Sequence, residues 1–107
     1  MEVPAVINQL ITAQEQRDSA KYIACFTDTA TVHDEGKTHT GKAEIRRWNE
    51  KTTLEYNMVW SPKAFEATDN GGILTTAVSG TFPGSPITMQ FHFEIENGLI
   101  QSITMKG

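Results

Sequence analysis

Apolar residues at the start of the chain recur every three or four positions, the spacing of an amphipathic helix. They are Val3, Val6, Ile7, Leu10 and Ala13. Pro4 suits the first turn of such a helix, where an N–H group would have no partner. Asp18 can then cap a second short helix, whose inner stripe is Tyr22, Ile23 and Phe26. We predict two consecutive helices over residues 2–26.

The stretch DTATVHDEG, residues 28–36, is typical of a strand that ends in a carboxylate. Successive side chains of a strand point to opposite faces, so Ala30, Val32 and Asp34 share one face and His33 points away from it. An ionised carboxylate on a core-directed face is costly unless it is hydrogen-bonded, paired or facing a cavity. Asp34 is therefore the first candidate functional residue.

A third helix is predicted over residues 42–53, after the turn-rich segment DEGKTHTG, with Ile45, Trp48 and Thr52 on one face. From residue 54 the apolar pattern changes to period two, which is typical of strands. The predicted strands cover residues 54–69, 73–82, 87–95 and 99–105. The turn signals DNGG, PGSP and ENG separate them, and Pro62 indicates a bulge in the first.

This order of elements, ααβαββββ, predicts an α+β fold with helices packed on one face of a curved, mostly antiparallel sheet. The chain of 107 residues carries no repeat, linker or low-complexity segment. We therefore expect a single domain over residues 1–107.

Composition excludes several classes of partner. The chain is 38% hydrophobic and carries a net charge of −4 with no run of Lys or Arg, which argues against nucleic-acid and anionic-membrane surfaces. Apolar runs are too short to span a bilayer, and the N-terminus does not resemble a signal peptide. Cys25 stands alone, so we expect a reducing, cytoplasmic location, with Cys25 as a small buried hydrophobe rather than a nucleophile.

The segment YIACFTDTATVHDEGKTHTGKAEIRRW, residues 22–48, resembles the SnoaL-like, polyketide cyclase-like branch of the nuclear transport factor 2-like superfamily, which also includes the ketosteroid isomerases. The resemblance rests on an aromatic residue ending the second helix, an acid and an alanine before the strand, and a His-Asp pair at its end. Further on come a glycine, an isoleucine and a tryptophan. These residues are Phe26, Asp28, Ala30, His33, Asp34, Gly41, Ile45 and Trp48.

The resemblance implies a cystatin-like α+β roll: a conical half-barrel whose curved sheet wraps around three N-terminal helices and leaves an apolar pocket. In ketosteroid isomerases the aspartate at the position of Asp34 moves a proton between carbons of the steroid. The resemblance thus implies a pocket lined by Leu10, Val32, Trp48, Met58, Met89 and Phe91, with Asp34 as a possible base. It also implies a homodimer formed through the open sheet face.

Two departures argue against true steroid isomerisation. The isomerases hold the dienolate oxygen with a tyrosine on the first helix and a second aspartate on the penultimate strand. Those positions correspond here to Leu10 and Phe91. Because one lost oxyanion donor typically costs about 2.7–4 kcal/mol of barrier, two hydrocarbon replacements make that reaction improbable.

Other polar residues have simpler interpretations. His33, Asp34, Glu35 and His39 are close in sequence, but neighbouring residues of a strand diverge and no metal-binding spacing joins them. We expect no metal and no cofactor. His92 falls on the polar face of its strand, which favours a solvent or dimer residue. Tyr56, Met58 and Trp60 alternate on one side of a predicted strand and either line a cavity or pack on the sheet.

Three function classes are consistent with the sequence. The first is an isomerase-, cyclase- or dehydratase-type enzyme that acts on a small apolar carbonyl compound, with Asp34 as base. The second is a non-catalytic domain that binds a small apolar ligand. The third is a dimerisation module whose cavity is filled by its own Met and Phe side chains.

Overall fold

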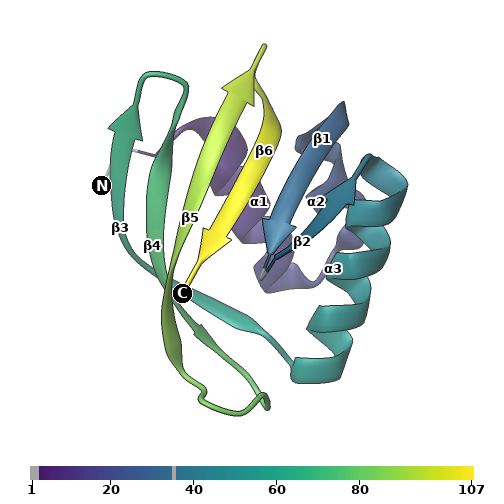
Figure 1. The fold of residues 1–107 in the computed structure, drawn as a ribbon, viewed down its shortest axis with the longest axis vertical. Coiled ribbons are helices and arrows are strands. Elements are labelled where there is room, and N and C mark those ends of the chain that lie inside the picture. Colours follow the sequence, from purple (N-terminus) through teal and green to yellow (C-terminus); the bar gives the residue numbers. More distant parts are fainter. Residues whose placement is uncertain (1–2, 35) are drawn as a thin grey trace.

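The computed structural model describes residues 3–34 and 36–107, which form three helices and one six-stranded sheet (Figure 1). The helices are α1 (Ala5–Gln16), α2 (Ser19–Ala24) and α3 (Lys42–Tyr56). The strands are β1 (Phe26–Asp34), β2 (Lys37–Thr40), β3 (Val59–Thr68), β4 (Gly71–Ser79), β5 (Ile87–Glu96) and β6 (Leu99–Lys106). The mixed α+β class and the open, curved sheet agree with the prediction.

The sheet pairs β1, from the first third of the chain, with β6 at its C-terminal end. Its strand order is β2-β1-β6-β5-β4-β3, and every neighbouring pair is antiparallel except β1 and β6. Figure 1 shows α1 and α2 behind the sheet and α3 beside β1 and β2. The first and last strands of the chain, β1 and β6, therefore pair with each other as the second and third strands of the sheet.

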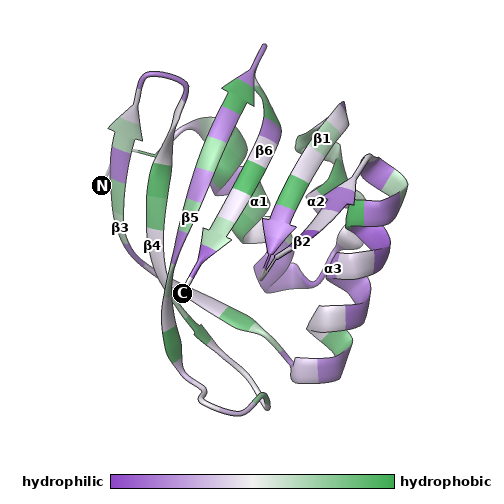
Figure 2. Cartoon of the chain, in the orientation of Figure 1, coloured by the Kyte–Doolittle hydropathy of each residue, from purple (hydrophilic) through white to green (hydrophobic). Residues whose placement is uncertain are grey.

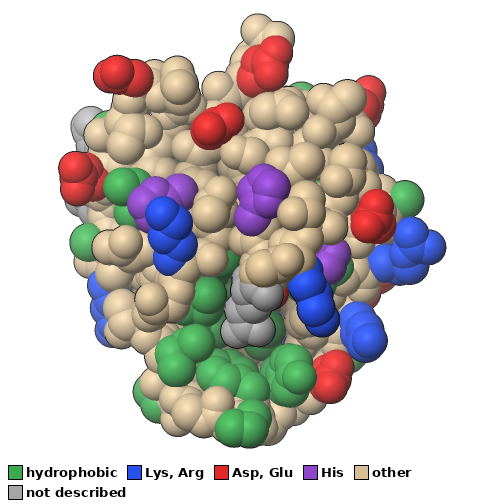
Figure 3. Space-filling view, viewed as in Figure 1, with side chains coloured by type: hydrophobic (Ala, Val, Ile, Leu, Met, Phe, Trp, Pro, Cys, Tyr) green, Lys and Arg blue, Asp and Glu red, His purple; other side chains and the backbone are tan. Residues whose placement is uncertain are grey.

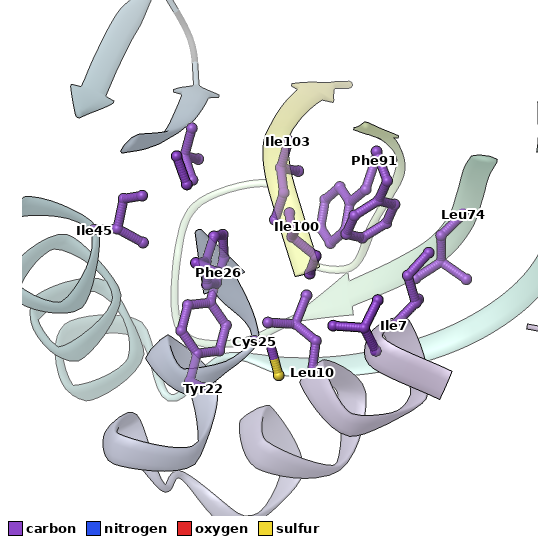
Figure 4. Close-up of a cluster of buried hydrophobic side chains, with 14 of the residues drawn as sticks. Ile7, Leu10, Tyr22, Cys25, Phe26, Ile45, Leu74, Phe91, Ile100 and Ile103 are labelled. Atoms are coloured by element: carbon purple, nitrogen blue, oxygen red, sulfur yellow. The ribbon is translucent and has the colours of Figure 1, made fainter. Parts of the chain in front are cut away.

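The core fills the space between the inner face of the sheet and the helices (Figure 4). Figure 2 shows hydrophobic and hydrophilic residues alternating along strands such as β5 and β6, which offer one apolar face to this core. The largest fully buried aromatic side chains are Tyr22 and Phe26, whose ring centroids lie 5.3 Å apart, and Phe91. Burial of these faces is the main driving force for the fold.

Several predicted boundaries are wrong. The second helix ends at Ala24, and Phe26, expected at the end of that helix, begins β1. The strand predicted at 73–82 is β4, over Gly71–Ser79.

The segment at 37–40 is a strand rather than part of a turn: β2 pairs antiparallel with β1, and Gly36 makes the turn with a φ of +79°. Its residues are mostly exposed, so this edge strand has no apolar alternation to reveal it. The third helix runs on to Tyr56 and ends where Asn57 adopts a left-handed φ of 50°. The apolar residue Leu54 indicated the start of a strand, but it lies in α3 and its side chain is exposed to solvent.

Other local predictions are confirmed. The register of β3 against β4 shifts between Pro62 and Ala64, which is the bulge expected at Pro62. Asp18 caps α2 by accepting a hydrogen bond from the backbone N–H of Lys21. Cys25 is buried in the core, as its apolar surroundings in the sequence indicated.

Candidate functional site

A cavity of about 420 Å³ lies between α3, the end of α1 and the inner face of the sheet. This volume falls within the range of roughly 300–1,000 Å³ that is usual for small-molecule sites. Its described lining residues are Gln14, Asp34, Trp48, Asn49, Thr52, Tyr56, Met58, Trp60, Phe82, Pro83, Ile87, Met89, Phe91 and Met105. Five of these are aromatic and three are methionine, so the walls are largely apolar.

Aromatic pairs build two walls of the cavity. Trp60 of β3 meets Phe91 of β5 edge to face, with ring centroids 5.0 Å apart. Tyr56 meets Phe82 at 90°, with centroids 6.1 Å apart. Such edge-to-face geometry is favourable because the positive edge of one ring faces the negative face of the other.

The edge strand β2 supports Trp48, which forms a third wall of the cavity. His39 of β2 stacks on Trp48 of α3, with ring centroids 5.0 Å apart and planes at 25°. The indole therefore has a fixed partner outside the cavity as well as a place in its lining.

The connection between β4 and β5 partly covers the cavity. The backbone N–H of Thr81 donates a 2.7 Å hydrogen bond to the carbonyl of Tyr56, at the end of α3. Gly80 packs so closely on the same carbonyl that a Cβ atom there would clash. This anchorage brings Phe82 and Pro83 into the lining. Figure 3 shows hydrophobic side chains gathered over this connection, at the lower end of the face.

Asp34 lies at the end of β1, where it pairs with Lys37 of β2 on one side and Met105 of β6 on the other. Its side chain is half-buried and lines the cavity, on the same side of β1 as the buried Ala30 and Val32. Among the described lining residues it is the only carboxylate, and none of them is Lys, Arg, His or Cys.

Two buried carboxamides also line the cavity. Gln14 of α1 is 4% exposed and Asn49 of α3 is 7% exposed. The Nε2 of Gln14 donates a 3.1 Å hydrogen bond to Oγ1 of Thr53, while its Oε1 has no partner in the described part of the chain. Beside them, Thr52 directs its hydroxyl to the carbonyl of Trp48, 3.0 Å away.

The lining contains Asp34 and four of the six residues expected at the pocket: Trp48, Met58, Met89 and Phe91. The structure places the other two residues elsewhere. Leu10 and Val32 are fully buried in the core and are not among the described residues that line the cavity. Leu10 points between α1 and the sheet one helical turn before Gln14, and Val32 comes two residues before Asp34 on β1, deeper in the packed interior.

Sequence reasoning missed Gln14 and Asn49, although a signal was present. Each stands four residues after a buried apolar residue of the same helix, Leu10 and Ile45 respectively. A polar residue that continues a core-facing stripe must find a partner or face a cavity. Phe82, Pro83 and Ile87 were also missed, because their place depends on how the β4–β5 connection folds back on α3.

The histidines lie outside the cavity lining. His33 is exposed and lies 3.1 Å from the hydroxyl of Thr38 through Nδ1. Glu35, considered above with His33 and His39, falls outside the described residues. Within 3–34 and 36–107, no three His, Cys, Asp or Glu side chains are grouped to hold a metal ion. No helix in those ranges has the length and apolar character needed to cross a membrane.

Burial perturbs two groups elsewhere in the core. Desolvation raises the pKa of the Tyr22 phenol well above its ordinary value, and the nearby Cys25 adds to this. Burial also raises the pKa of the Cys25 thiol. A thiol held protonated in the core is a poor nucleophile, so Cys25 is a structural residue.

Comparison with known proteins gives the family. A sequence profile described as the SnoaL-like domain matches residues 7–103. No curated protein sequence matches the chain significantly. A protein from Sinorhizobium meliloti that is suggested to be a polyketide cyclase is 29% identical, with a TM-score of 0.95 over 97% of this chain and 95% of that one.

Two more distant structures share the fold alone. A protein with a ketosteroid isomerase-like fold from Catenulispora acidiphila, in complex with trimethylamine, is 17% identical, with a TM-score of 0.86 over 99% of this chain and 87% of that one. A Mycobacterium tuberculosis protein, in complex with estradiol-17β-hemisuccinate, is 12% identical, with a TM-score of 0.79 over 99% and 95%. The profile match spans most of the chain, and this protein therefore belongs to the SnoaL-like domain family.

Proposed function

We propose that this protein binds a small, largely apolar carbonyl compound in the cavity and that Asp34 moves a proton on it, in a reaction of the isomerase, cyclase or dehydratase type. The observation that carries the proposal is the position of Asp34: it is the one carboxylate among the described residues of an otherwise aromatic and methionine-rich lining. A carboxylate beside an apolar ligand is suited to act as a general base.

Proton abstraction next to a carbonyl needs little more than a base and a site of low dielectric constant. General base catalysis of this kind contributes about 10²–10⁴-fold in rate. The aromatic walls and the β4–β5 connection reduce the access of water, which strengthens electrostatic interactions inside the cavity.

Covalent catalysis has less support. The described lining offers no Ser, Cys, Lys or His as a nucleophile, and the hydroxyl of Thr52 is already donated to a backbone carbonyl. Of the remaining nucleophile types in the described lining, Tyr56 carries a phenol, which is a weak nucleophile while protonated, and Asp34 is assigned here as the base. True steroid isomerisation is disfavoured as well, because Leu10 is in the core and Phe91 presents only hydrocarbon to the cavity.

The similar solved structures are consistent with a proton-transfer reaction on a small organic molecule. The Sinorhizobium meliloti structure, at 29% identity, is suggested to be a polyketide cyclase. A cyclisation of that kind begins when a base removes a proton next to a carbonyl, which is the step assigned here to Asp34. The two distant neighbours are complexes with small organic molecules.

A proton-exchange experiment tests the proposal without knowledge of the natural substrate. The bicyclic ketone 2-tetralone is incubated with the protein in D₂O, and loss of its α-proton signals is followed by NMR spectroscopy. We expect acceleration over buffer, and competition by naphthalene, which fills the cavity but has no oxygen. Binding of 2-tetralone without exchange would reduce the function to ligand binding, and no binding would contradict the proposal.

A further inference from the structure

Two buried carboxamides in the cavity offer hydrogen-bonding groups to a ligand. Asn49 is 7% exposed and lines the cavity. Gln14 uses one amide hydrogen for Thr53 and leaves Oε1 without a partner among the described residues. Buried polar groups normally find partners, because an unpaired one loses its interaction with water. The unpartnered Oε1 of Gln14, in the same lining as the carboxamide of Asn49, indicates a polar ligand atom.

Asn49 and Gln14 reach the cavity from two helices, while Asp34 enters it from the end of β1. The polar groups of the lining thus come from separate elements, and the aromatic and methionine side chains fill the remainder. This distribution is typical of a ligand site: mostly apolar, with a small number of placed polar groups that fix orientation.

We propose that Asn49 and Gln14 hold an oxygen atom of the ligand, and that the ligand is a neutral compound carrying a carbonyl or hydroxyl group. The inference rests on the proposed function for the identity of the site. Carboxamides donate to and accept from neutral oxygens. No Lys or Arg is among the described lining residues, so a carboxylate or phosphate would enter beside Asp34 without compensation.

The carboxamides also offer the hydrogen bonding that proton transfer requires at the carbonyl oxygen of the ligand. When the Asp34 carboxylate takes the α-proton, the C–H electron pair forms a carbon–carbon double bond and the carbonyl π electrons move to oxygen. The resulting enolate oxygen needs a hydrogen-bond donor. An amide N–H of Asn49 meets that need, although Leu10 and Phe91 occupy the positions where the isomerases place their donors. The Oε1 of Gln14 is an acceptor, so it pairs with the oxygen when that oxygen carries a proton, as in the enol or a hydroxyl group. The proton then returns from Asp34 to carbon or leaves to solvent.

The test compares two ligands of the same shape. Naphthalene has no oxygen, whereas 2-naphthol resembles the enol of 2-tetralone. Equilibrium dialysis gives the affinity of each for the wild type and for Asn49→Leu, Asn49→Ala and Gln14→Met. Asn8→Leu is the matched control, because Asn8 carries an exposed carboxamide on α1 that bonds to the carbonyl of Val3.

We expect the wild type and Asn8→Leu to bind 2-naphthol about tenfold more tightly than naphthalene, as one or two hydrogen bonds provide. In Asn49→Leu the preference falls to about twofold while naphthalene affinity is unchanged, and the melting temperature does not fall. Gln14→Met shows a smaller loss of preference.

Other outcomes distinguish the role inferred for Asn49 and Gln14 from the proposed function on which it rests. Retention of the full preference in Asn49→Leu, Asn49→Ala and Gln14→Met would overturn the inference. Equal loss of both ligands would also overturn it, because that pattern reports a structural role. Wild-type binding of naphthalene with no preference for 2-naphthol contradicts the inference alone. Failure of the wild type to bind either compound contradicts the proposed function as well. A preference without proton exchange preserves this inference and removes catalysis.

Discussion

Gln14 donates a 3.1 Å hydrogen bond from Nε2 to Oγ1 of Thr53, 39 residues further along the chain. The bond connects α1 to α3, and both residues are buried, at 4% and 6% exposed. Gln14 also lines the cavity. One interaction therefore sets the spacing of two helices and the orientation of a carboxamide at the candidate site.

Replacing Thr53 with valine should destabilise the protein by about 1–3 kcal/mol, because the variant keeps the shape but leaves Nε2 of Gln14 without its acceptor. The free energy of unfolding from urea denaturation measures this. Adding Gln14→Met should restore part of the loss, since both partners are then apolar. Thr52→Val is the control, with a change below about 0.5 kcal/mol, because its hydroxyl only bonds back to its own helix. Equal losses at Thr52 and Thr53 would contradict this account of the bond.

Trp48 should be a wall of the ligand site rather than an ordinary core residue. We expect 2-tetralone to raise the melting temperature of the wild type, and Trp48→Ala to lower the ligand affinity about tenfold or more through loss of the aromatic surface. Leu54→Ala on the same helix is the control, because Leu54 is 75% exposed and is not among the described lining residues. An equal ligand-induced shift in the wild type and Trp48→Ala would remove Trp48 from the site.

Much of the fold could be predicted from the sequence, because apolar spacing reports directly which face of an element is buried. The stripe of α1, the apolar face of β5 and the turns at residues 69–72 and 96–98 all follow from local rules. The strand at 37–40 could not be found in this way. It pairs through backbone atoms at the sheet edge and exposes most of its side chains, so its sequence KTHT carries no apolar signal.

The candidate site was only partly predictable, for a physical reason. Alternation along β1 is enough to place Asp34 on the inner side, and Trp48 follows from the face of α3. The cavity itself depends on how distant segments meet. Phe82 reaches it because Thr81 bonds to Tyr56, and Gln14 of α1 is held at it by the bond to Thr53 of α3. Tertiary contacts of this kind have no local pattern.

Tyr22 should make the protein less stable in alkali. Its pKa is raised by burial, so the folded state keeps the phenolic proton at a pH where the unfolded chain has lost it. The stabilisation is complete below the unfolded pKa of about 10 and is lost as the pH rises above it. Burial also raises the pKa of the Cys25 thiol, so its ionisation in the unfolded chain lowers the free energy of unfolding from about pH 8.5 upward.

In Tyr22→Phe we expect a smaller decline in the free energy of unfolding between pH 9.5 and 11, by up to about 1.4 kcal/mol per pH unit. Near pH 7 the substitution should be close to neutral, because the Tyr22 hydroxyl has no hydrogen-bond partner among the described residues. Urea denaturation across this pH range measures both effects. An identical alkaline decline in the two proteins would show that Tyr22 does not ionise on unfolding.

Pairing of two copies through the outer face of the sheet, which the resemblance implies, stays a prediction. Gln90 of β5 is exposed on that face, next to the half-buried His92. A two-fold axis that passes near Gln90 would bring this residue close to its own copy, and for that arrangement Gln90→Lys should weaken the dimer by repulsion between like charges. Analytical ultracentrifugation should then show a shift toward the monomer mass, whereas Lys63→Gln on β3 should not change it. A wild-type protein that is monomeric at every concentration would contradict the pairing.

The central claim, that Asp34 is the base, is tested most directly by the rate at which the α-protons of 2-tetralone exchange with D₂O. Asp34→Asn is compared with Asp28→Asn, which replaces a carboxylate that is 93% exposed on the same strand. We predict that Asp34→Asn lowers the catalysed rate by about 10²–10⁴-fold while binding of 2-tetralone is retained, and that Asp28→Asn exchanges as the wild type does. An Asp34→Asn variant that exchanges at the wild-type rate would contradict the account.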